Sequence, residues 1–595
     1  MNRGCPCCSP ELSALLGMMV SRRTVLKAGA LFAGLSILPA TKTVAATRLQ
    51  PAEPPPAAPA DVIFWGGPIV PVGGPRREAA ALAVRGQRIV AVGERHAVAR
   101  FRGPATEVVD LRGRALLPGF VEPHLHLLPT AIARTFLDVS PFTIATFAAA
   151  KEKLSAAVGE ASPGAWVVAS GYDPSLMSDV APDSQITVQD LDPIAPNNPV
   201  LIFNLSGHIA YVNTQAFEIA GITRETPDPP GGRFLRDANG DLTGVVEEVT
   251  ALKPFVATLP QTSVDALLEL ALAVAQDAAA AGCTTLNDNG TGAFSPNGLD
   301  DAVLLQQLVS HPNAPVRMSA FPIGLLLHEW PFGPGAGDDM LRFTKIKFWA
   351  DGSTQGYTAA LKQPYLNSTS TGFLNYTPEE LRAAVAEAIG LGWPVSIHCN
   401  GDAALEQALD VFEAILDPSV RSGQGARHRI EHCTVNEEAQ LERMARLGLT
   451  PSFTIGHVYY WGRVFRDQIL GPERAARIDP GASCVRLGMP FSLHSDAFTT
   501  PIEPLRYVQT AVTRRVRDGG DVLGAEQRVS VDEALKAVTL YPAWQLDLDP
   551  IVGSLEVGKY ADLVILEQDP RMVDPDAISA IKVLETWLGG VRKYL

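Results

Sequence analysis

The sequence predicts an α/β protein whose main domain is a (β/α)₈ TIM barrel, accompanied by a small β-sandwich domain built from both termini. Three observations lead to this prediction. Short apolar segments alternate with helical stretches in the middle of the 595-residue chain, both ends are rich in strand-like segments, and metal-binding residue types stand where the predicted strands end. Alternation of strand and helix is typical of a parallel sheet, and eight such units favour a closed barrel over an open sheet.

The first 60 residues do not belong to this predicted fold. Residues 21–27, Ser-Arg-Arg-Thr-Val-Leu-Lys, form a twin-arginine pattern, and the apolar run from Ala28 to Ala40 suits the core of a signal peptide. We therefore expect residues 1–46 to be a signal peptide that the twin-arginine translocation machinery reads and that is cleaved near Ala46. The mature protein would be periplasmic or secreted; the alternative is a chance arginine pair before a buried helix. Residues 47–60 are rich in proline and are expected to form a linker.

The two ends of the remaining chain have the same character. Residues 61–114 contain strand-like runs such as Val62–Trp65 and Arg88–Gly93, separated by glycine and charged turns. Residues 546–595 contain the comparable runs Leu563–Leu566 and Val583–Trp587. We expect these two parts to form one β-sandwich domain.

Residues 115–545 are expected to form the barrel. The eight predicted strands are Ala115–Leu127, Cys283–Asp288, Val316–Ile323, Thr344–Ala350, Pro394–Cys399, His428–Thr434, Leu449–Ile455 and Phe491–Asp496. Stretches with helical periodicity lie between them, including Val264–Ala281, Pro378–Leu391 and Glu437–Leu447. The segment of about residues 129–260 is too long for a loop and is expected to be a subdomain inserted after the first strand.

Composition excludes several classes of partner. The formal net charge of −15 disfavours binding to nucleic acids and to anionic lipids. The apolar windows after residue 60 are short or interrupted by charge, so no membrane span is expected once the signal peptide is removed. The four cysteines of the predicted mature chain are too few for a disulfide framework.

Polar residues at the strand ends carry the predicted chemistry. His124 and His126 lie two apart at the end of the first strand, so they share a face and can bind one ion together. A His-x-His pair alone is weak evidence. Later strands end with Lys347, His398, His432 and Asp496, and in barrels of this kind the active site lies at the carboxyl ends of the strands. Each could be an ordinary polar residue, but together they predict a metal site.

At these residues the chain resembles the amidohydrolase superfamily, and within it the N-substituted formamide deformylase-like (YtcJ-like) branch. The resemblance covers roughly residues 61–595. It rests on the motifs Pro-Gly-Phe-Val-Glu-Pro-His-Leu-His at 118–126, Ser-Gly-His-Ile-Ala-Tyr-Val-Asn at 206–213, Lys-Phe-Trp-Ala-Asp-Gly-Ser at 347–353, His-Cys-Asn-Gly-Asp-Ala-Ala at 398–404 and Arg-His-Arg-Ile-Glu-His at 427–432.

The resemblance implies one or two divalent ions, with zinc as the expected metal. His124 and His126 would bind one ion, and His398 and His432 a second. Lys347 would be carboxylated, because an ammonium has no lone pair for a metal whereas a carbamate can bridge two ions. Asp496 would bind metal, accept a proton from the attacking water and pass it to the leaving nitrogen.

Three further assignments concern residues outside this ligand set. His208, in the inserted subdomain, would contact the substrate or its oxyanion, with a structural histidine as the alternative. Cys399 and Cys433 should point away from their histidine neighbours into the core. Asp351 is expected to hold the loop after the fourth strand.

The predicted function is a metal-dependent amidohydrolase that cleaves a C–N bond (amide, formamide or N-acyl) of a small molecule with a metal-activated water. One alternative keeps the site but changes the bond to an ester, lactone or cyclic amide. Another is an exported, non-catalytic binding protein on a degenerate barrel, against which the intact ligand set argues. Aromatic residues near strand ends are expected either to line an apolar pocket or to pack: Phe348, Trp349, Tyr459, Tyr460 and Trp461.

Overall fold

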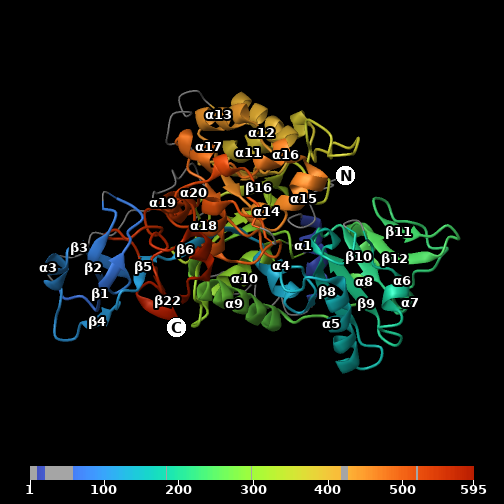
Figure 1. Ribbon diagram of the computed structural model, residues 1–595, viewed down its shortest axis with the longest axis horizontal. Coiled ribbons are helices and arrows are strands. Elements are labelled where there is room, and N and C mark those ends of the chain that lie inside the picture. Colours follow the sequence, from blue (N-terminus) through green and yellow to red (C-terminus); the bar gives the residue numbers. More distant parts are fainter. Residues whose placement is uncertain are drawn as a thin grey trace.

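The computed structural model describes residues 10–20, 58–74, 76–181, 184–295, 298–416, 427–517 and 520–595. Figure 1 shows three regions arranged along the long axis: a β-rich end, a central region of mixed strands and helices, and a second lobe at the opposite end. The central region carries the candidate site.

One mixed sheet, with both parallel and antiparallel strand pairs, contains strands from both ends of the chain. Its strands from the N-terminal side are β1 (Val62–Ile69), β2 (Ala79–Arg85), β3 (Arg88–Gly93), β4 (Glu107–Asp110) and β5 (Ala115–Pro118), and those from the C-terminal side are β21 (Leu563–Leu566), β22 (Val583–Leu588) and β23 (Val591–Tyr594). The two groups meet where β21 pairs antiparallel with β5. Their shared core includes Phe64, whose ring lies edge-on to Trp587 with centroids 5.2 Å apart.

The central region contains two parallel sheets. The first has the order β15 (Leu341–Phe343), β14 (Arg317–Pro322), β13 (Cys283–Thr291) and β6 (Phe120–Leu125). The second has the order β16 (Ile346–Trp349), β17 (Val395–Cys399), β18 (Arg429–His432), β19 (Thr450–Phe453) and β20 (Ser492–Leu493). Parallel bridges link the sheets at both edges, Ile323 with Lys347 and Leu125 with Ala497.

The first predicted strand is wrong in one respect, because Ala115–Leu127 forms two strands. β5 joins the sheet of the chain ends, whereas β6 joins the central sheet. The chain changes sheet at Gly119, where a Cβ would lie 2.2 Å from the side chain of Thr284 and no larger residue fits. Both strands are buried along their whole length, so hydropathy gives no sign of the break.

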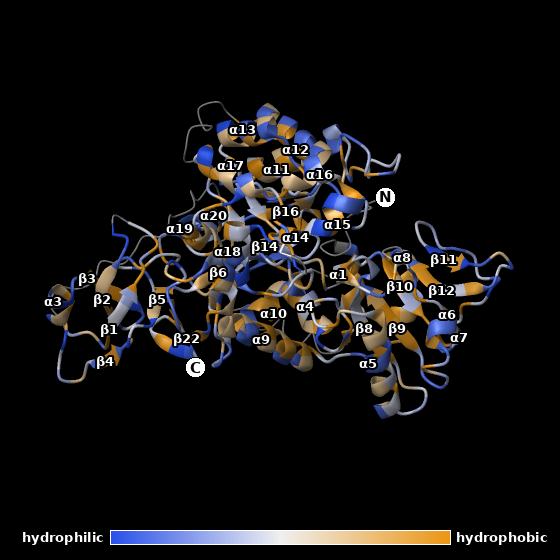
Figure 2. Ribbon diagram, in the orientation of Figure 1, coloured by the Kyte–Doolittle hydropathy of each residue, from blue (hydrophilic) through white to orange (hydrophobic). Residues whose placement is uncertain are grey.

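The predicted helices are confirmed to within about one residue. α9 (Val264–Ala280) begins after Ser263, whose side chain accepts a hydrogen bond from the amide of Ala266. α11 (Pro378–Gly390) begins with a capping box formed by Thr377 and Glu380. α12 (Asp402–Ile415) and α13 (Glu438–Leu447) show both hydrophilic and hydrophobic stretches, as expected for helices that cover a core with one face (Figure 2).

A separate lobe follows β6 and the short helix α4 (Leu127–Ala133). It contains a six-stranded sheet and helices α5 (Phe147–Glu160), α6 (Val188–Leu191), α7 (Thr214–Ala220) and α8 (Val249–Val256). The strand order is β11 (Arg233–Arg236), β12 (Leu242–Glu247), β10 (Ile209–Val212), β9 (Val200–Asn204), β8 (Val167–Tyr172) and β7 (Leu137–Asp138). The lobe meets the central region where the indole of Trp461 donates to Asp173 at 3.1 Å.

Part of the expected signal peptide lies within the described residues and packs against the fold. Helix α1 (Pro10–Gly17) is apolar, and Leu12, Leu15, Leu16 and Met19 are buried in the main core. The amide of Thr262 donates to the carbonyl of Met19 at 2.6 Å. The twin-arginine motif, the cleavage region and most of the linker lie outside the described residues. Among the described residues, no helix is long and apolar enough to span a membrane.

Candidate metal centre

The six predicted ligands all come from the ends of central strands and all are buried. They are His124 in β6, His126 at the start of α4, Lys347 in β16, His398 in β17, His432 in β18 and Asp496 just after β20. The parallel arrangement brings these strand ends to one side of the central region, where polar side chains meet away from solvent.

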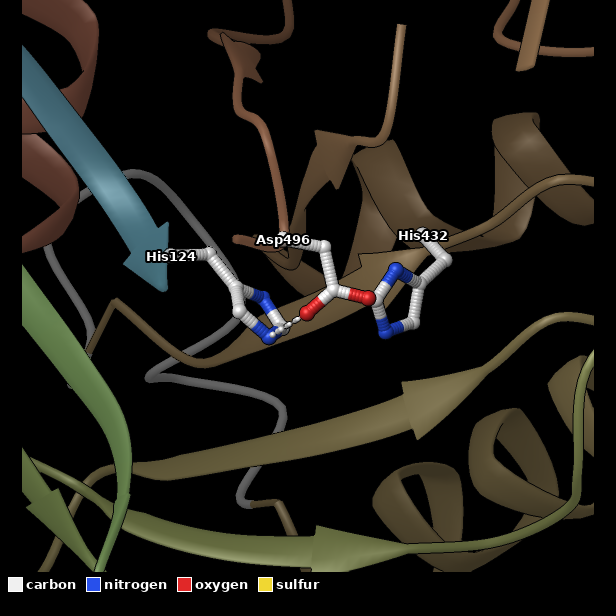
Figure 3. A group of neighbouring side chains, drawn as sticks. All are labelled: His124, His432 and Asp496. Carbon is white, nitrogen blue, oxygen red and sulfur yellow. Dashed lines mark ion pairs between the residues drawn. The ribbon is translucent and has the colours of Figure 1, made fainter. Parts of the chain in front are cut away.

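Three of these side chains form the centre of the cluster. Ligand atoms of His124, His432 and Asp496 all lie within 4.8 Å of one another, and Figure 3 shows the carboxylate of Asp496 between the two imidazoles. The Oδ1 atom of Asp496 is 3.2 Å from Nε2 of His124 and 3.2 Å from Nε2 of His126. The structure therefore brings His126 to the same carboxylate oxygen.

The backbone turns out of the extended conformation at two of these ligands. His432 has φ +67° and Asp496 has φ +55°, values that side-chain-bearing residues adopt rarely and that are concentrated at functional sites. In β18, Glu431 and His432 are adjacent, so regular alternation would place them on opposite faces. The turn at His432 ends the alternation and lets both side chains reach His124.

The hydrogen bonds of His124 decide which nitrogen faces the cluster. Its Nδ1 is 2.8 Å from Oε2 of Glu431, and a carboxylate oxygen only accepts, so the proton lies on Nδ1. In the neutral ring Nε2 then presents a lone pair toward Asp496 Oδ1, and two electron-rich atoms face each other at 3.2 Å. A divalent cation between them would satisfy both, so the donor set fits a metal.

The two histidines of the second predicted pair, His398 and His432, are also arranged as neutral ligands. His432 has Nδ1 2.7 Å from Thr454 Oγ1, and its buried Nε2 has no hydrogen-bond partner among the described residues. His398 has Nε2 3.0 Å from the carbonyl of Gly352, which leaves Nδ1 with the lone pair. Burial, followed by the charge of Lys347, lowers the pKa of His398 to about 3. The two rings lie with centroids 4.4 Å apart.

The carboxylates of Asp496 and Glu431 are ionised. Burial alone would raise the pKa of Asp496, but the neighbouring histidines His124, His126 and His432 hold it well below its usual range. Burial likewise opposes ionisation of Glu431, and Arg429 overcomes this through two contacts of 2.7 Å and holds its pKa well below the usual range. An anionic ligand and an anionic partner of His124 thus flank neutral imidazoles.

Lys347 belongs to this cluster. Its side chain is fully buried, and its charge contributes to lowering the pKa of both His398 and His126. Its Nζ lies 5.2 Å from the centroid of Trp349. An ammonium has no lone pair to offer a metal, so Lys347 could serve as a ligand only after its amine is modified.

His208 is outside the predicted ligand set and lies in the inserted lobe, against the loop after β16. It occupies the turn between β9 and β10, and Nδ1 is 3.2 Å from both carboxylate oxygens of Glu248. Its ring faces the loop after β16, since a Cβ on Gly356 would lie 3.4 Å from the ring. That loop includes Gly352, whose carbonyl contacts His398.

Several residues of the site have no assigned role in the sequence analysis. Glu248 is the partner of His208, Glu431 and Arg429 fix His124, and His494 stacks on His124 with centroids 4.4 Å apart at 13°. Arg429 and Glu431 stand two apart in one strand, a spacing that places them on a shared face and could have revealed the pair. Glu248 is 40 residues from His208, and nothing local links them.

Other residues near the strand ends have structural contacts. Asp351 accepts hydrogen bonds from the amides of Ala360, Asn400 and Gly401, so it holds the loop after β16. Cys399 and Cys433 are buried free thiols in the main core.

The aromatic residues at the strand ends are divided between packing and the surroundings of the cluster. Trp461 is fully buried and packs against Phe142 of the inserted lobe. Trp349 lies near His126, since a Cβ on Gly290 would contact both rings, at 3.7 Å and 3.3 Å respectively.

The buried His/Asp cluster at the strand ends of a parallel α/β region is consistent with the metal site of a metal-dependent hydrolase. The chain belongs to the amidohydrolase family, whose model matches residues 107–594. Two relatives match this chain over nearly all of their own length. N-substituted formamide deformylase of Arthrobacter pascens is 28% identical over 87% of this chain and 95% of that protein. Putative amidohydrolase YtcJ of Bacillus subtilis is 28% identical over 83% of this chain and 92% of that protein. The crystal structure of an uncharacterized metal-dependent hydrolase from Pyrococcus horikoshii shares the fold, with TM-score 0.68 and 22% identity over 86% of this chain and 99% of that one.

Proposed function

We propose that this protein hydrolyses a C–N bond of the amide, formamide or N-acyl type in a small molecule. The observation that carries the proposal is the pair His124 and Asp496 at the buried strand ends. Nε2 of His124 and Oδ1 of Asp496 face each other at 3.2 Å with their lone pairs, an arrangement that a bound cation would stabilise. The similarity to an N-substituted formamide deformylase over most of both chains supports this choice of bond.

The proposal includes a closed (β/α)₈ barrel as the scaffold. β15 and β16 are successive parts of one interrupted strand, because β14 pairs with β15 and its neighbour Ile323 bridges to Lys347 in β16. With that strand counted once, the two central sheets supply eight strands. The Leu125–Ala497 bridge and the bond from the His126 amide to the Ala497 carbonyl, 2.8 Å, support closure at the other edge.

The metal would be held by residues already in place. His124, His126 and Asp496 would bind one divalent ion, zinc by preference for imidazole and carboxylate ligands, and His398 and His432 a second. A carbamate on Lys347 would supply the bridging oxygen. When bound, such ions lower the pKa of water and polarise a carbonyl.

The protein's own groups would perform the proton transfers and the positioning. Asp496 is ionised and reaches the centre of the cluster, so it can accept a proton from the attacking water. Glu431 holds His124 by its Nδ1 hydrogen, which fixes the ring orientation. Burial of the whole set excludes bulk water from the reacting atoms.

A substrate screen tests the type of bond. The purified full chain would be assayed against N-alkyl formamides, N-acyl amines, cyclic amides, lactones and simple esters. Asp467→Asn is the control, because Asp467 is partly exposed and pairs with Arg466. We expect turnover of formamides or N-acyl amines. Turnover of esters or lactones alone, or of none of these compounds, would overturn the proposal.

We also propose that the protein is exported through the twin-arginine pathway, on the strength of Arg22 and Arg23 before an apolar run. Changing both arginines to lysine should trap the precursor in the cytoplasm, and fractionation followed by N-terminal sequencing measures this. Because helix α1 is packed into the core, the uncleaved precursor should also unfold at a higher temperature than the chain cleaved near Ala46. Normal export of the double variant would contradict the assignment.

A further inference from the structure

His208 has one nitrogen fully engaged and the other unengaged. Nδ1 lies 3.2 Å from both oxygens of Glu248, which only accept, so Nδ1 carries a proton. The residue is only 8% exposed, and its Nε2 is buried without a hydrogen-bond partner in the part of the chain that the structure describes. A buried polar atom without a partner costs free energy, and such atoms in native proteins usually meet a ligand or water.

The backbone of Glu248 is held in a conformation that suits this contact. Its φ is +71°, in the region that favours glycine, although it carries a long side chain. Its amide donates to the carbonyl of His208 at 2.7 Å, which ties the two residues together at the backbone as well. Strain of this kind persists where the surrounding structure imposes it, most often at functional sites.

The position of the His208 ring shows which part of the protein its Nε2 faces. A Cβ on Gly356 would lie 3.4 Å from Cδ2 and 3.7 Å from Nε2 of His208, so this edge of the ring is turned toward the loop after β16. The same loop contacts His398 through the Gly352 carbonyl. Nε2 therefore lies on the side of the inserted lobe that faces the loop joined to His398, whereas Asp496 lies just after β20.

We propose that His208 is the acid that protonates the leaving nitrogen and that Glu248 is its positioning residue; this inference rests on the proposed function. As the C–N bond breaks, its electron pair stays on nitrogen and takes the proton from Nε2 of the His208 imidazolium. The ring is left neutral with Nδ1–H still donated to Glu248, and it regains a proton from solvent water. The proton removed from the attacking water stays with Asp496 until the products leave, so the two transfers use separate groups.

A series of leaving groups tests this assignment. Protonation of nitrogen matters most for a strongly basic amine and little for an aniline with electron-withdrawing substituents. kcat/KM would be measured on N-alkyl formamides and para-substituted formanilides, up to the nitro compound, for His208→Ala, Glu248→Gln and the parent. Glu247→Gln is the matched control, since Glu247 is adjacent and pairs with Arg233 at the surface.

We expect His208→Ala to lower kcat/KM by about 10²–10⁴ for the alkyl compounds and by less than about tenfold for the nitroanilide. Glu248→Gln should show a smaller loss with the same trend, while Glu247→Gln should match the parent. Metal content and unfolding temperature should be unchanged in all variants, which separates the effect from a structural one. A loss that is equal across the series would overturn the role of His208 and leave the proposed function intact. Absence of amide turnover by the parent would overturn both.

Discussion

The imidazole of His124 lies between two carboxylates, with Nδ1 2.8 Å from Glu431 and Nε2 3.2 Å from Asp496. A neutral imidazole has one proton, so it can donate to only one of them. Arg429 neutralises Glu431 through a two-point contact, whereas Asp496 lies beside the imidazoles of His124, His126 and His432 and accepts a hydrogen bond from the hydroxyl of Thr499 at 3.4 Å. This arrangement is the one expected of a metal ligand and its outer partner, in which the carboxylate behind the histidine orients the nitrogen in front.

Glu431→Gln should weaken metal binding by roughly 10–100-fold, because a neutral amide oxygen holds the Nδ1 proton of His124 less strongly than the carboxylate does. Metal affinity would be measured by competition with a chelator of known affinity. Glu437→Gln, at an exposed glutamate that pairs with Lys362, is the control. Because Glu431→Gln also leaves Arg429 buried without its anion, the double variant with Arg429→Met separates stability from affinity. Unchanged metal affinity in the single and the double variant would contradict a role of Glu431 in metal binding.

Lys347→Ala should lose most activity and any second ion, since a carbamate on Lys347 is expected to bridge the two positions. Added acetate or propionate together with metal should restore part of the activity by replacing the carbamate oxygens. Metal stoichiometry and activity with and without the carboxylate measure this. Electron density for an unmodified amine at Lys347, beside a single fully occupied ion, would contradict the bridging role.

Asp496→Asn should retain the fold and much of the metal but lose the proton acceptor. We expect kcat to fall by about 10²–10⁴ while KM changes less, because general-base catalysis contributes a factor of this size. Steady-state kinetics and metal analysis on the same preparation provide the test. A variant that keeps its metal and near-normal turnover would show that a group other than Asp496 accepts the proton of the attacking water.

His428 should make the fold sensitive to acid. Burial, followed by the charge of Lys345, lowers its pKa to about 3, while its Nδ1 accepts a hydrogen bond from the amide of Val395 at 2.9 Å. The unfolded chain binds this proton near pH 6.5, so the stabilisation is complete above that pH and is lost as the pH falls toward 3. Between two such pKa values the loss is about 1.4 kcal/mol per pH unit.

Denaturant unfolding at pH 7 and pH 5 compares the parent with His428→Asn, whose side-chain oxygen can still accept from Val395. The parent should lose about 2 kcal/mol more than the variant over this interval. Equal losses would show that folding does not lower the pKa of His428.

The strand positions could be predicted from the sequence because each strand is a short buried run between helices with clear periodicity and caps. The break at Gly119 could not, since β5 and β6 are both buried throughout and the reason for the break is the distant Thr284. Alternation in β18 places Glu431 and His432 on opposite faces, and only the positive φ at His432 brings both to His124. The partnership of His208 with Glu248 depends on the fold of the inserted lobe, which no local pattern specifies.

The packing of helix α1 into the core was also not predicted. Its leucines are consistent with the start of a signal peptide, and their contacts with α4 and α8 form only in the folded chain. An apolar segment of the sequence can therefore belong either to a signal peptide or to the core of the folded protein, and only the tertiary contacts distinguish the two.

Metal removal tests the central claim most directly. The purified protein would be analysed for bound metals, dialysed against a chelator, assayed, and assayed again after zinc or another divalent ion is restored, with circular dichroism to follow the fold. We predict one or two divalent ions per chain, loss of hydrolytic activity when they are removed, and its return when they are added back. A metal-free, folded protein that hydrolyses its substrate at an unchanged rate would contradict the account.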